Sequence, residues 1–229
     1  MKYGKIQQGT FIERPNRFIA RVLINDKVET VHVKNTGRCR EILTPGAKVI
    51  LEKAGHEGRK TPFSLIAAYK GETIINIDSQ APNQVVYEAL NQGLLPQFGK
   101  LTWVVKEVRF GNSRFDLYYE NESERGFIEV KGVTLERDGT ALFPDAPTER
   151  GTKHLLEMAE AVKSGFRGCI FFLIQMKAPQ RFLPNTVMDP KFTKALRLSR
   201  DAGVGIMAYD SVVTEGSLCM GEPVKIDSF

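Results

Sequence analysis

A chain of 229 residues is too long for a minimal domain and can bury either one large core or two ordinary ones. Its hydrophobic fraction of 42% and charged fraction of 26% are those of a globular protein, and no apolar run approaches the roughly 20 residues of a membrane helix. Because the three cysteines are widely spaced and no signal-peptide core follows Met1, we expect a cytoplasmic protein without membrane contact or a zinc site.

The net charge of +5 is concentrated in the first third of the chain. Residues 1–80 carry 14 Lys and Arg against 8 Asp and Glu, whereas residues 81–229 carry 18 against 19. Such an asymmetry suggests a polyanionic partner such as nucleic acid. A basic solvated surface without a partner is nearly as common an explanation.

The first 80 residues alternate short strand-like runs with turn signals at Pro15-Asn16, Asn25-Asp26 and Pro45-Gly46. Five or six short strands predict a small OB-like β-barrel, which we bound at residues 1–80. Such barrels bind nucleic acid through basic and aromatic side chains. The candidates here are Arg14, Arg17, Phe18, Arg21, Lys34, Arg38 and Arg40. In an alternative of equal weight, the phenylalanine belongs to the core and the arginines are merely solvated.

A helix that begins at Ala81-Pro82 opens a second domain over residues 81–229. After it we expect a strand over 101–110, a hairpin, a helix with Thr148 as its N-cap, a buried strand at 168–175, a helix from Pro190 and a strand at 204–209. This order predicts an α/β domain with a mixed sheet.

The hairpin consists of strands over 114–119 and 126–132 joined by a polar turn at 121–124, and residues 133–136 are expected to extend its second arm. A turn centred between residues 122 and 123 places Asp116 opposite Glu129, and Arg114 opposite Lys131, with all four on one face. The other face would then pack on the core through Phe115, Leu117, Ile128 and Val130.

Two carboxylates that face each other about 5 Å apart suit a hard divalent cation. We therefore expect Mg²⁺ or Mn²⁺ to be held by Asp116, Glu129 and the carbonyl of Val130, in a site that can hydrolyse phosphodiesters. Lys131 would orient the water or neutralise developing charge. Further candidates for the site are Glu88, Arg114, Glu149, Arg150 and His154. The alternative is a solvated hairpin face, whose pairs contribute only a few tenths of a kcal/mol each.

Asp116, Glu129-Val130-Lys131 and the upstream Glu88 resemble the active-site pattern of the PD-(D/E)XK nuclease superfamily. Phe115 stands where that pattern has proline and Gly132 follows the lysine, but neither departure removes a ligand. The longer runs at 113–116, 128–135 and 143–155, together with Asn35-Thr36-Gly37, resemble the sugar fermentation stimulation protein A family.

The family resemblance implies an N-terminal OB-like domain joined to a nuclease-like domain, non-specific DNA binding and a regulatory link to sugar (maltose) metabolism. Three functions follow as hypotheses. The first is a DNA-binding, metal-dependent nuclease, the second is a non-catalytic DNA-binding regulator, and the third is a metal-dependent enzyme acting on a small phosphorylated or sugar substrate. The oligomeric state stays open, with a homodimer as one option.

Overall fold

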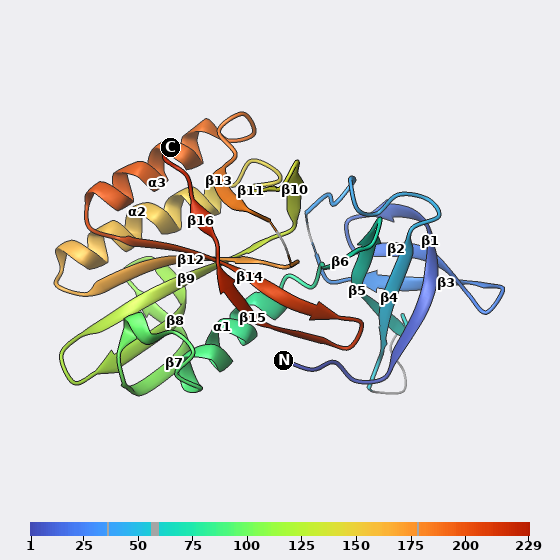
Figure 1. Ribbon diagram of the computed structural model, residues 1–229, viewed down its shortest axis with the longest axis horizontal. Coiled ribbons are helices and arrows are strands. Elements are labelled where there is room, and N and C mark those ends of the chain that lie inside the picture. Colours follow the sequence, from blue (N-terminus) through green and yellow to red (C-terminus); the bar gives the residue numbers. More distant parts are fainter. Residues whose placement is uncertain (36, 56–59, 178) are drawn as a thin grey trace.

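The computed structural model describes residues 1–35, 37–55, 60–177 and 179–229. Two lobes lie side by side, a β-barrel formed by the first part of the chain and a larger α/β lobe formed by the rest (Figure 1). No helix in the described ranges has both the length and the apolar character needed to cross a membrane.

The barrel has the predicted OB-like topology. Its sheet order is β3-β2-β1-β4-β5-β6, and a parallel pairing of β3 with β5 closes the first five of these strands into a barrel. The two positive φ angles at Asn25 and Asp26 form the tight turn between β2 and β3, as two-residue hairpin turns require. The strands are β1 (Ile6–Asn16), β2 (Ile19–Ile24), β3 (Lys27–Val33), β4 (Lys48–Lys53), β5 (Phe63–Lys70) and β6 (Thr73–Asn76).

The second lobe contains a six-stranded mixed sheet in the order β15-β14-β12-β9-β8-β7 and a four-stranded sheet in the order β10-β11-β13-β16. Its helices are α1 (Ala81–Asn91), α2 (Glu149–Lys163) and α3 (Pro190–Asp201), with a 3-10 turn at Pro96–Phe98. Its strands are β7 (Leu101–Phe110), β8 (Ser113–Asn121), β9 (Arg125–Val133), β10 (Leu135–Arg137), β11 (Thr140–Phe143), β12 (Arg167–Ile174), β13 (Arg181–Pro184), β14 (Gly205–Thr214), β15 (Ser217–Pro223) and β16 (Lys225–Ile226).

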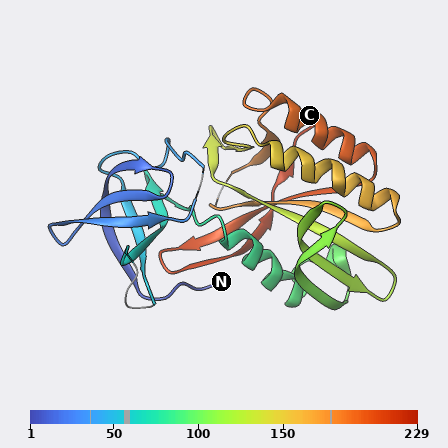
Figure 2. The same cartoon turned by 180° about the vertical axis from the view of Figure 1, so that it is seen from behind.

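Helices cover both faces of the large sheet. The pair α2 and α3 lies on one face and α1 on the other, as the views from the front and from behind show (Figures 1 and 2). Strand β12 is therefore buried on both sides, with Phe171 in the cluster under α1 and Phe172 in the cluster under α2 and α3. This arrangement explains the continuous apolar run of β12, since each buried aromatic side chain contributes about 1.5–3 kcal/mol.

Both longer helices of this lobe begin with a side-chain cap. The hydroxyl of Thr148 accepts a hydrogen bond from the N–H of Gly151 at 3.0 Å, and Asp189 accepts one from the N–H of Phe192 at 2.9 Å. These bonds satisfy amide groups that the first helical turn leaves free. The predicted cap at Thr148 is confirmed.

One expectation for the central hairpin is wrong. We expected Leu135 and Glu136 to extend its second arm, but β9 ends at Val133 and these residues form β10, which pairs with β11 in the smaller sheet. The strands β11, β13, β15 and β16 are too short or too weakly patterned to be recognised in the sequence.

The two lobes are joined by polar contacts close to the linker between them. Gln175, just after β12, donates hydrogen bonds to the Oδ1 of Asn76 at 2.8 Å and to the carbonyl of Asp78 at 3.0 Å. The β14–β15 hairpin reaches the barrel (Figure 1), where Glu215 accepts hydrogen bonds from Lys48 and Tyr69. The start of α1 is therefore held in a fixed position beside the barrel.

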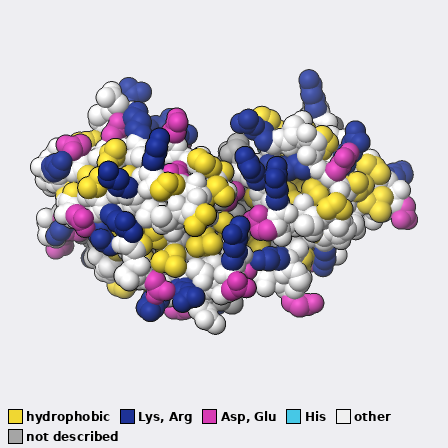
Figure 3. Space-filling view, turned by 90° about the horizontal axis from the view of Figure 1, so that it is seen from above, with side chains coloured by type: hydrophobic (Ala, Val, Ile, Leu, Met, Phe, Trp, Pro, Cys, Tyr) yellow, Lys and Arg dark blue, Asp and Glu magenta, His cyan; other side chains and the backbone are white. Residues whose placement is uncertain are grey.

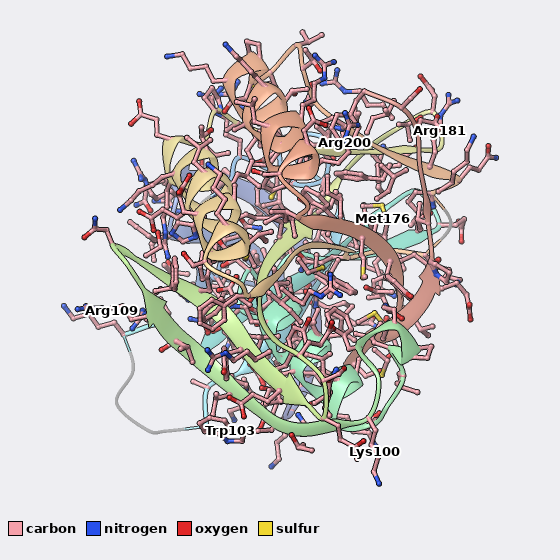
Figure 4. All side chains as sticks on the ribbon, turned by 90° about the vertical axis from the view of Figure 1, so that its left-hand side faces the viewer. Lys100, Trp103, Arg109, Met176, Arg181 and Arg200 are labelled. Atoms are coloured by element: carbon pink, nitrogen blue, oxygen red, sulfur yellow. The ribbon has the colours of Figure 1, made fainter. Side chains whose placement is uncertain are left out.

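Strand β7 forms the outer edge of the large sheet. Arg109 and Trp103 stand at this edge and point away from the lobe (Figure 4). Trp103 is 54% exposed, and its indole packs against Tyr118 with 6.0 Å between the ring centres. The central hairpin of β8 and β9 lies one strand further in, under cover of the helices.

Candidate active site

The hairpin of β8 and β9 has the predicted register. Leu117 pairs with Ile128 and Tyr119 with Gly126, which is the pairing that a turn between residues 122 and 123 requires. Extending this register by one step places Asp116 opposite Glu129. The regular ladder ends before that step, at Leu117 and Ile128.

Asp116 replaces the missing ladder bond with its side chain. Its Oδ2 atom accepts a hydrogen bond from the backbone N–H of Val130 at 2.8 Å. Its Oδ1 atom accepts one from the side-chain amide of Asn83, in the first turn of α1, at 2.8 Å. The carboxylate is thus fixed from two sides, and Asn83 is a site residue that the sequence reasoning missed.

Glu129 lies almost fully buried in the middle of β9, with 2% of its surface exposed. Its Oε1 atom accepts hydrogen bonds from Lys131 Nζ at 2.6 Å and from His154 Nδ1 at 2.5 Å. Its Oε2 atom is buried and has no hydrogen-bond partner among the described residues. A buried carboxylate oxygen without a partner is costly, so this atom indicates a place for a ligand.

The two carboxylates affect each other electrostatically. Burial, together with the charge of Glu129, raises the pKa of Asp116 to about 6 from its ordinary 3.8. Burial also opposes ionisation of Glu129, but the hydrogen bond from His154 and the charge of Lys131 hold the pKa of Glu129 below its usual range. The pair therefore resists carrying two negative charges unless a cation is added.

The predicted distribution of side chains over the hairpin faces is only partly correct. Leu117, Ile128 and Val130 belong to the cluster under α1, as one shared face requires, but Phe115 belongs to the opposite cluster under α2. The alternation of side chains between the two faces of β8 breaks at Asp116. The residue opposite it in β7 is Glu107, which has a φ of 59° that is irregular for a strand. A strictly alternating pattern cannot represent this kink.

Arg114 and Glu88 lie away from the two carboxylates. The guanidinium of Arg114 is exposed and lies 3.5 Å from Glu107, and Arg114 pairs with Arg109 of β7 rather than facing Lys131. Glu88 lies more than one turn beyond Asn83 on α1, where its carboxylate contacts the amino group of Met1 at 2.5 Å and the amide of Gln84 at 2.7 Å.

The three predicted site residues at the start of α2 comprise one buried side chain and two exposed ones. His154 is 6% exposed and reaches Glu129, whereas Glu149 and Arg150 are exposed at the start of the helix. The structure therefore brings together Asp116, Glu129, Lys131 and His154 from the sequence-based set. No group of three or more His, Cys, Asp and Glu side chains is placed to hold a metal within the described ranges.

In the barrel, the guanidinium of Arg14 is bonded to backbone carbonyls of neighbouring residues. Its guanidinium donates hydrogen bonds to four backbone carbonyls, of which those of Asn35 and Gly37 lie at 2.5 and 2.7 Å. The group is thus used to order the loop after β3. That loop contains the Asn35-Thr36-Gly37 match, whose central residue lies outside the described ranges.

Two more of the basic candidates in the barrel are ion-paired. Arg21 contacts Glu13 at 2.8 Å on the exposed surface. Lys34 is half-buried and contacts Glu52 at 3.1 Å and Asp78 at 3.2 Å. These contacts reduce the charge that either residue can offer to a polyanion.

The remaining candidates form an exposed basic patch, defined here as Arg17, Phe18, Arg38 and Arg40. The three arginines line a depression of about 440 Å³, and Phe18 is 50% exposed, with Arg17 stacked 5.9 Å from its ring centre. Phe18 is therefore a surface residue and not part of the core. Viewed from above, Lys and Arg side chains stand on both lobes beside the indentation between them (Figure 3).

The chain thus combines a closed OB-like barrel with a mixed-sheet α/β lobe that carries a carboxylate–lysine cluster. Family models agree: one for the SfsA N-terminal OB domain matches residues 12–77, and one for the sugar fermentation stimulation protein RE domain matches residues 80–217. The chain belongs to the sugar fermentation stimulation protein family, which confirms the resemblance seen in the sequence.

Similar proteins support the assignment over the whole chain. A sugar fermentation stimulation protein homolog from Alkaliphilus oremlandii is 53% identical over 232 residues, covering 99% of each chain. One from Clostridium botulinum (strain Kyoto / Type A2) is 52% identical over 229 residues, covering 99% of this chain and all of that one. A solved structure of Pyrococcus furiosus SfsA in complex with Ca²⁺ is 27% identical, with a TM-score of 0.91 over 100% of this chain and 98% of that one.

Proposed function

We propose that this protein is a DNA-binding, divalent-metal-dependent phosphodiesterase, with its site at the open end of the β8–β9 ladder. The observation that carries the proposal is the buried Oε2 atom of Glu129, which has no partner in the described ranges. The neighbouring carboxyl of Asp116 has a pKa that desolvation and the charge of Glu129 both raise. A buried carboxylate and a half-buried one that repel each other have a clear use when a cation separates them.

The donor set fits a hard cation. Asp116 and Glu129 offer carboxylate oxygens, and the carbonyl of Val130, which follows Glu129 in β9, is the third oxygen expected from the sequence. Mg²⁺ and Mn²⁺ suit oxygen-rich sites, and Mg²⁺ in particular needs only one or two carboxylates because it keeps several waters and takes substrate phosphate oxygens. The Pyrococcus furiosus relative is described in complex with Ca²⁺, another cation that prefers oxygen.

When bound, such a cation supplies Lewis acidity that neutralises charge on a phosphate group. Lys131 places an ammonium beside the same carboxylates, where it neutralises developing negative charge or orients the attacking water. Asn83 and the N–H of Val130 keep Asp116 in position. Glu88, Arg114, Glu149 and Arg150 have no part in this mechanism, because the structure does not bring them to the two carboxylates.

The basic patch on the barrel is the proposed contact with DNA. Arg17, Arg38 and Arg40 are exposed, and the exposed ring of Phe18 can stack on a base. Arg14 stabilises the loop that carries Arg38, because its guanidinium donates hydrogen bonds to the backbone carbonyls of Gly37 and Arg38. Lys34 and Arg21 contribute less because each is already paired with a carboxylate.

The test is cleavage of single-stranded, duplex and branched DNA with Mg²⁺ or Mn²⁺, using the wild type, Asp116→Asn and the exposed control Asp201→Asn. We expect metal-dependent cleavage by the wild type and the control, and loss of it in Asp116→Asn. Absence of cleavage on every substrate, or equal cleavage by Asp116→Asn, would overturn the catalytic proposal.

A second candidate function is a non-catalytic DNA-binding regulator of sugar metabolism. One observation favours it: Lys131 and His154 already satisfy Glu129 Oε1, so part of the site is stable without a cation. This function predicts DNA binding that weakens steeply with salt and survives Asp116→Asn, without cleavage under any metal.

A further inference from the structure

Two donors meet at the same oxygen of Glu129. Lys131 reaches Oε1 from the same strand, and His154 reaches it from α2, the helix that covers this face of the sheet. Because Glu129 is ionised and can only accept, the ring nitrogen Nδ1 of His154 carries the hydrogen. The second oxygen, Oε2, is left without a partner in the part of the chain that the structure describes.

The imidazole ring is itself held in place. His154 is 6% exposed, and its ring packs edge-on against Phe115, with 6.2 Å between ring centres and 81° between ring planes. Phe115 directly precedes Asp116 in β8. Its ring contacts the imidazole that hydrogen-bonds to Glu129. The kink that turns Phe115 toward α2 therefore also supports the imidazole.

We propose that His154 is a positioning residue, which fixes the carboxylate of Glu129 so that Oε2 faces the cation and Oε1 does not. This inference rests on the proposed function, since it concerns the same metal site. Lys131 alone sits on a flexible stem and does not fix a rotamer as a rigid, packed imidazole does. Groups that orient metal ligands typically change metal affinity 10–100-fold when they are removed.

A buried histidine can also be no more than a core residue with a satisfied hydrogen bond. A positioning role and a purely structural role for His154 predict different effects of two substitutions that have similar shapes. Asparagine and leucine have nearly the same shape, but only asparagine keeps a donor near the position of Nδ1. A structural histidine would make both variants lose stability without a specific effect on metal affinity.

The experiment is calorimetric titration of Mn²⁺ into the full-length wild type, His154→Asn, His154→Leu and Leu156→Asn, with thermal melting in chelator for each. Leu156 is 44% exposed on the same helix, so Leu156→Asn controls for the effect of asparagine on α2. We expect the affinity for Mn²⁺ to fall about 10–100-fold in His154→Leu and to return most of the way in His154→Asn. The control should bind like the wild type.

Each outcome decides a different claim. If the wild type does not bind Mn²⁺, the proposed metal site fails and the role of His154 fails with it. If the wild type binds Mn²⁺ and both His154 variants bind it equally well, or lose affinity only in proportion to stability, the positioning role alone is overturned.

A measurement on the wild type keeps the proposal testable if His154→Leu does not fold. The Nδ1–H proton of His154 should be visible by NMR, because a buried hydrogen bond slows its exchange with water. We expect this signal in the metal-free protein and after addition of Mg²⁺. Its absence, or a proton on the other ring nitrogen alone, would overturn the proposal.

Discussion

Asp116 accepts a hydrogen bond from the backbone N–H of Val130, at 2.8 Å, where the ladder between β8 and β9 ends. A side chain thus takes the place of a backbone acceptor, and the regular pairing of the two strands ends beside the half-buried Asp116 and the buried Glu129. The same geometry places Asp116 where its negative charge is unfavourable without a cation.

We predict that Asp116→Asn melts at a higher temperature than the wild type in chelator at pH 7.5. The pKa of Asp116 is raised to about 6, so the stability linked to its protonated form is complete below pH 4 and lost as the pH rises through 6. Asparagine is neutral throughout, and we expect a gain of about 1 kcal/mol, or about 2–4 °C. The gap should narrow when melting is repeated near pH 5, and a gap independent of pH would contradict this cause.

We predict that Lys131→Met separates metal binding from cleavage. Lys131 donates to Glu129 at 2.6 Å, so its removal leaves the site more negative and should keep or tighten Mn²⁺ binding. Cleavage should fall by about 10²–10³, the usual loss for one charge-stabilising donor. The exposed Lys153→Met is the control, and loss of Mn²⁺ binding in Lys131→Met would argue against the assigned role.

We predict that Arg38→Ala and Arg40→Ala each weaken DNA binding and reduce its salt dependence. One lost phosphate contact lowers the slope of log K against log salt by about 0.9 for duplex and about 0.7 for single strands. Arg21→Ala is a matched control from the same barrel, because Arg21 is paired with Glu13. Fluorescence anisotropy at several salt concentrations measures the slopes, and equal slopes for all three variants would count against the basic patch.

We predict that Gly132→Ala destabilises the junction between the lobes. A Cβ atom at this position would collide with Gln175 Oε1 and lie 2.8 Å from Pro82 Cγ. Gln175 cannot move freely, since it donates to Asn76 and to the carbonyl of Asp78. We expect a loss of about 1–3 kcal/mol, as for other overpacked sites.

Gly205→Ala is the control for this substitution. The nearest atom to its Cβ would be 3.5 Å away, an ordinary contact. Thermal melting should therefore separate the two variants by several degrees. Equal melting temperatures would mean that Gln175 and the start of α1 move easily to accommodate the added methyl group, contrary to the prediction. The close approach of Gln175 and Pro82 to position 132 also explains why a glycine follows Lys131.

Much of the fold follows from local pattern. The strands of the barrel, the caps of α2 and α3 and the register of the central hairpin depend on alternation, turn residues and capping residues, which are all visible in the sequence. The pairing of Leu117 with Ile128 is an example, because turn position and apolar alternation both require it. Such features need no knowledge of distant contacts.

The details of the site depend on contacts between distant residues. Asn83 reaches Asp116 across 33 positions of sequence, and Glu88 is drawn to Met1 across 87. The kink opposite Glu107 turns Phe115 to the α2 side, although the residue alternates normally in the sequence. Arg14 looks like an exposed cation until the carbonyls around it are known.

The most direct test of the metal site is a crystal structure of the wild type soaked with Mn²⁺, with anomalous diffraction data. We expect an anomalous peak between Asp116 and Glu129, within coordination distance of Glu129 Oε2 and an oxygen of Asp116. A soaked crystal with no peak there, or with Mn²⁺ bound only elsewhere, would contradict the account.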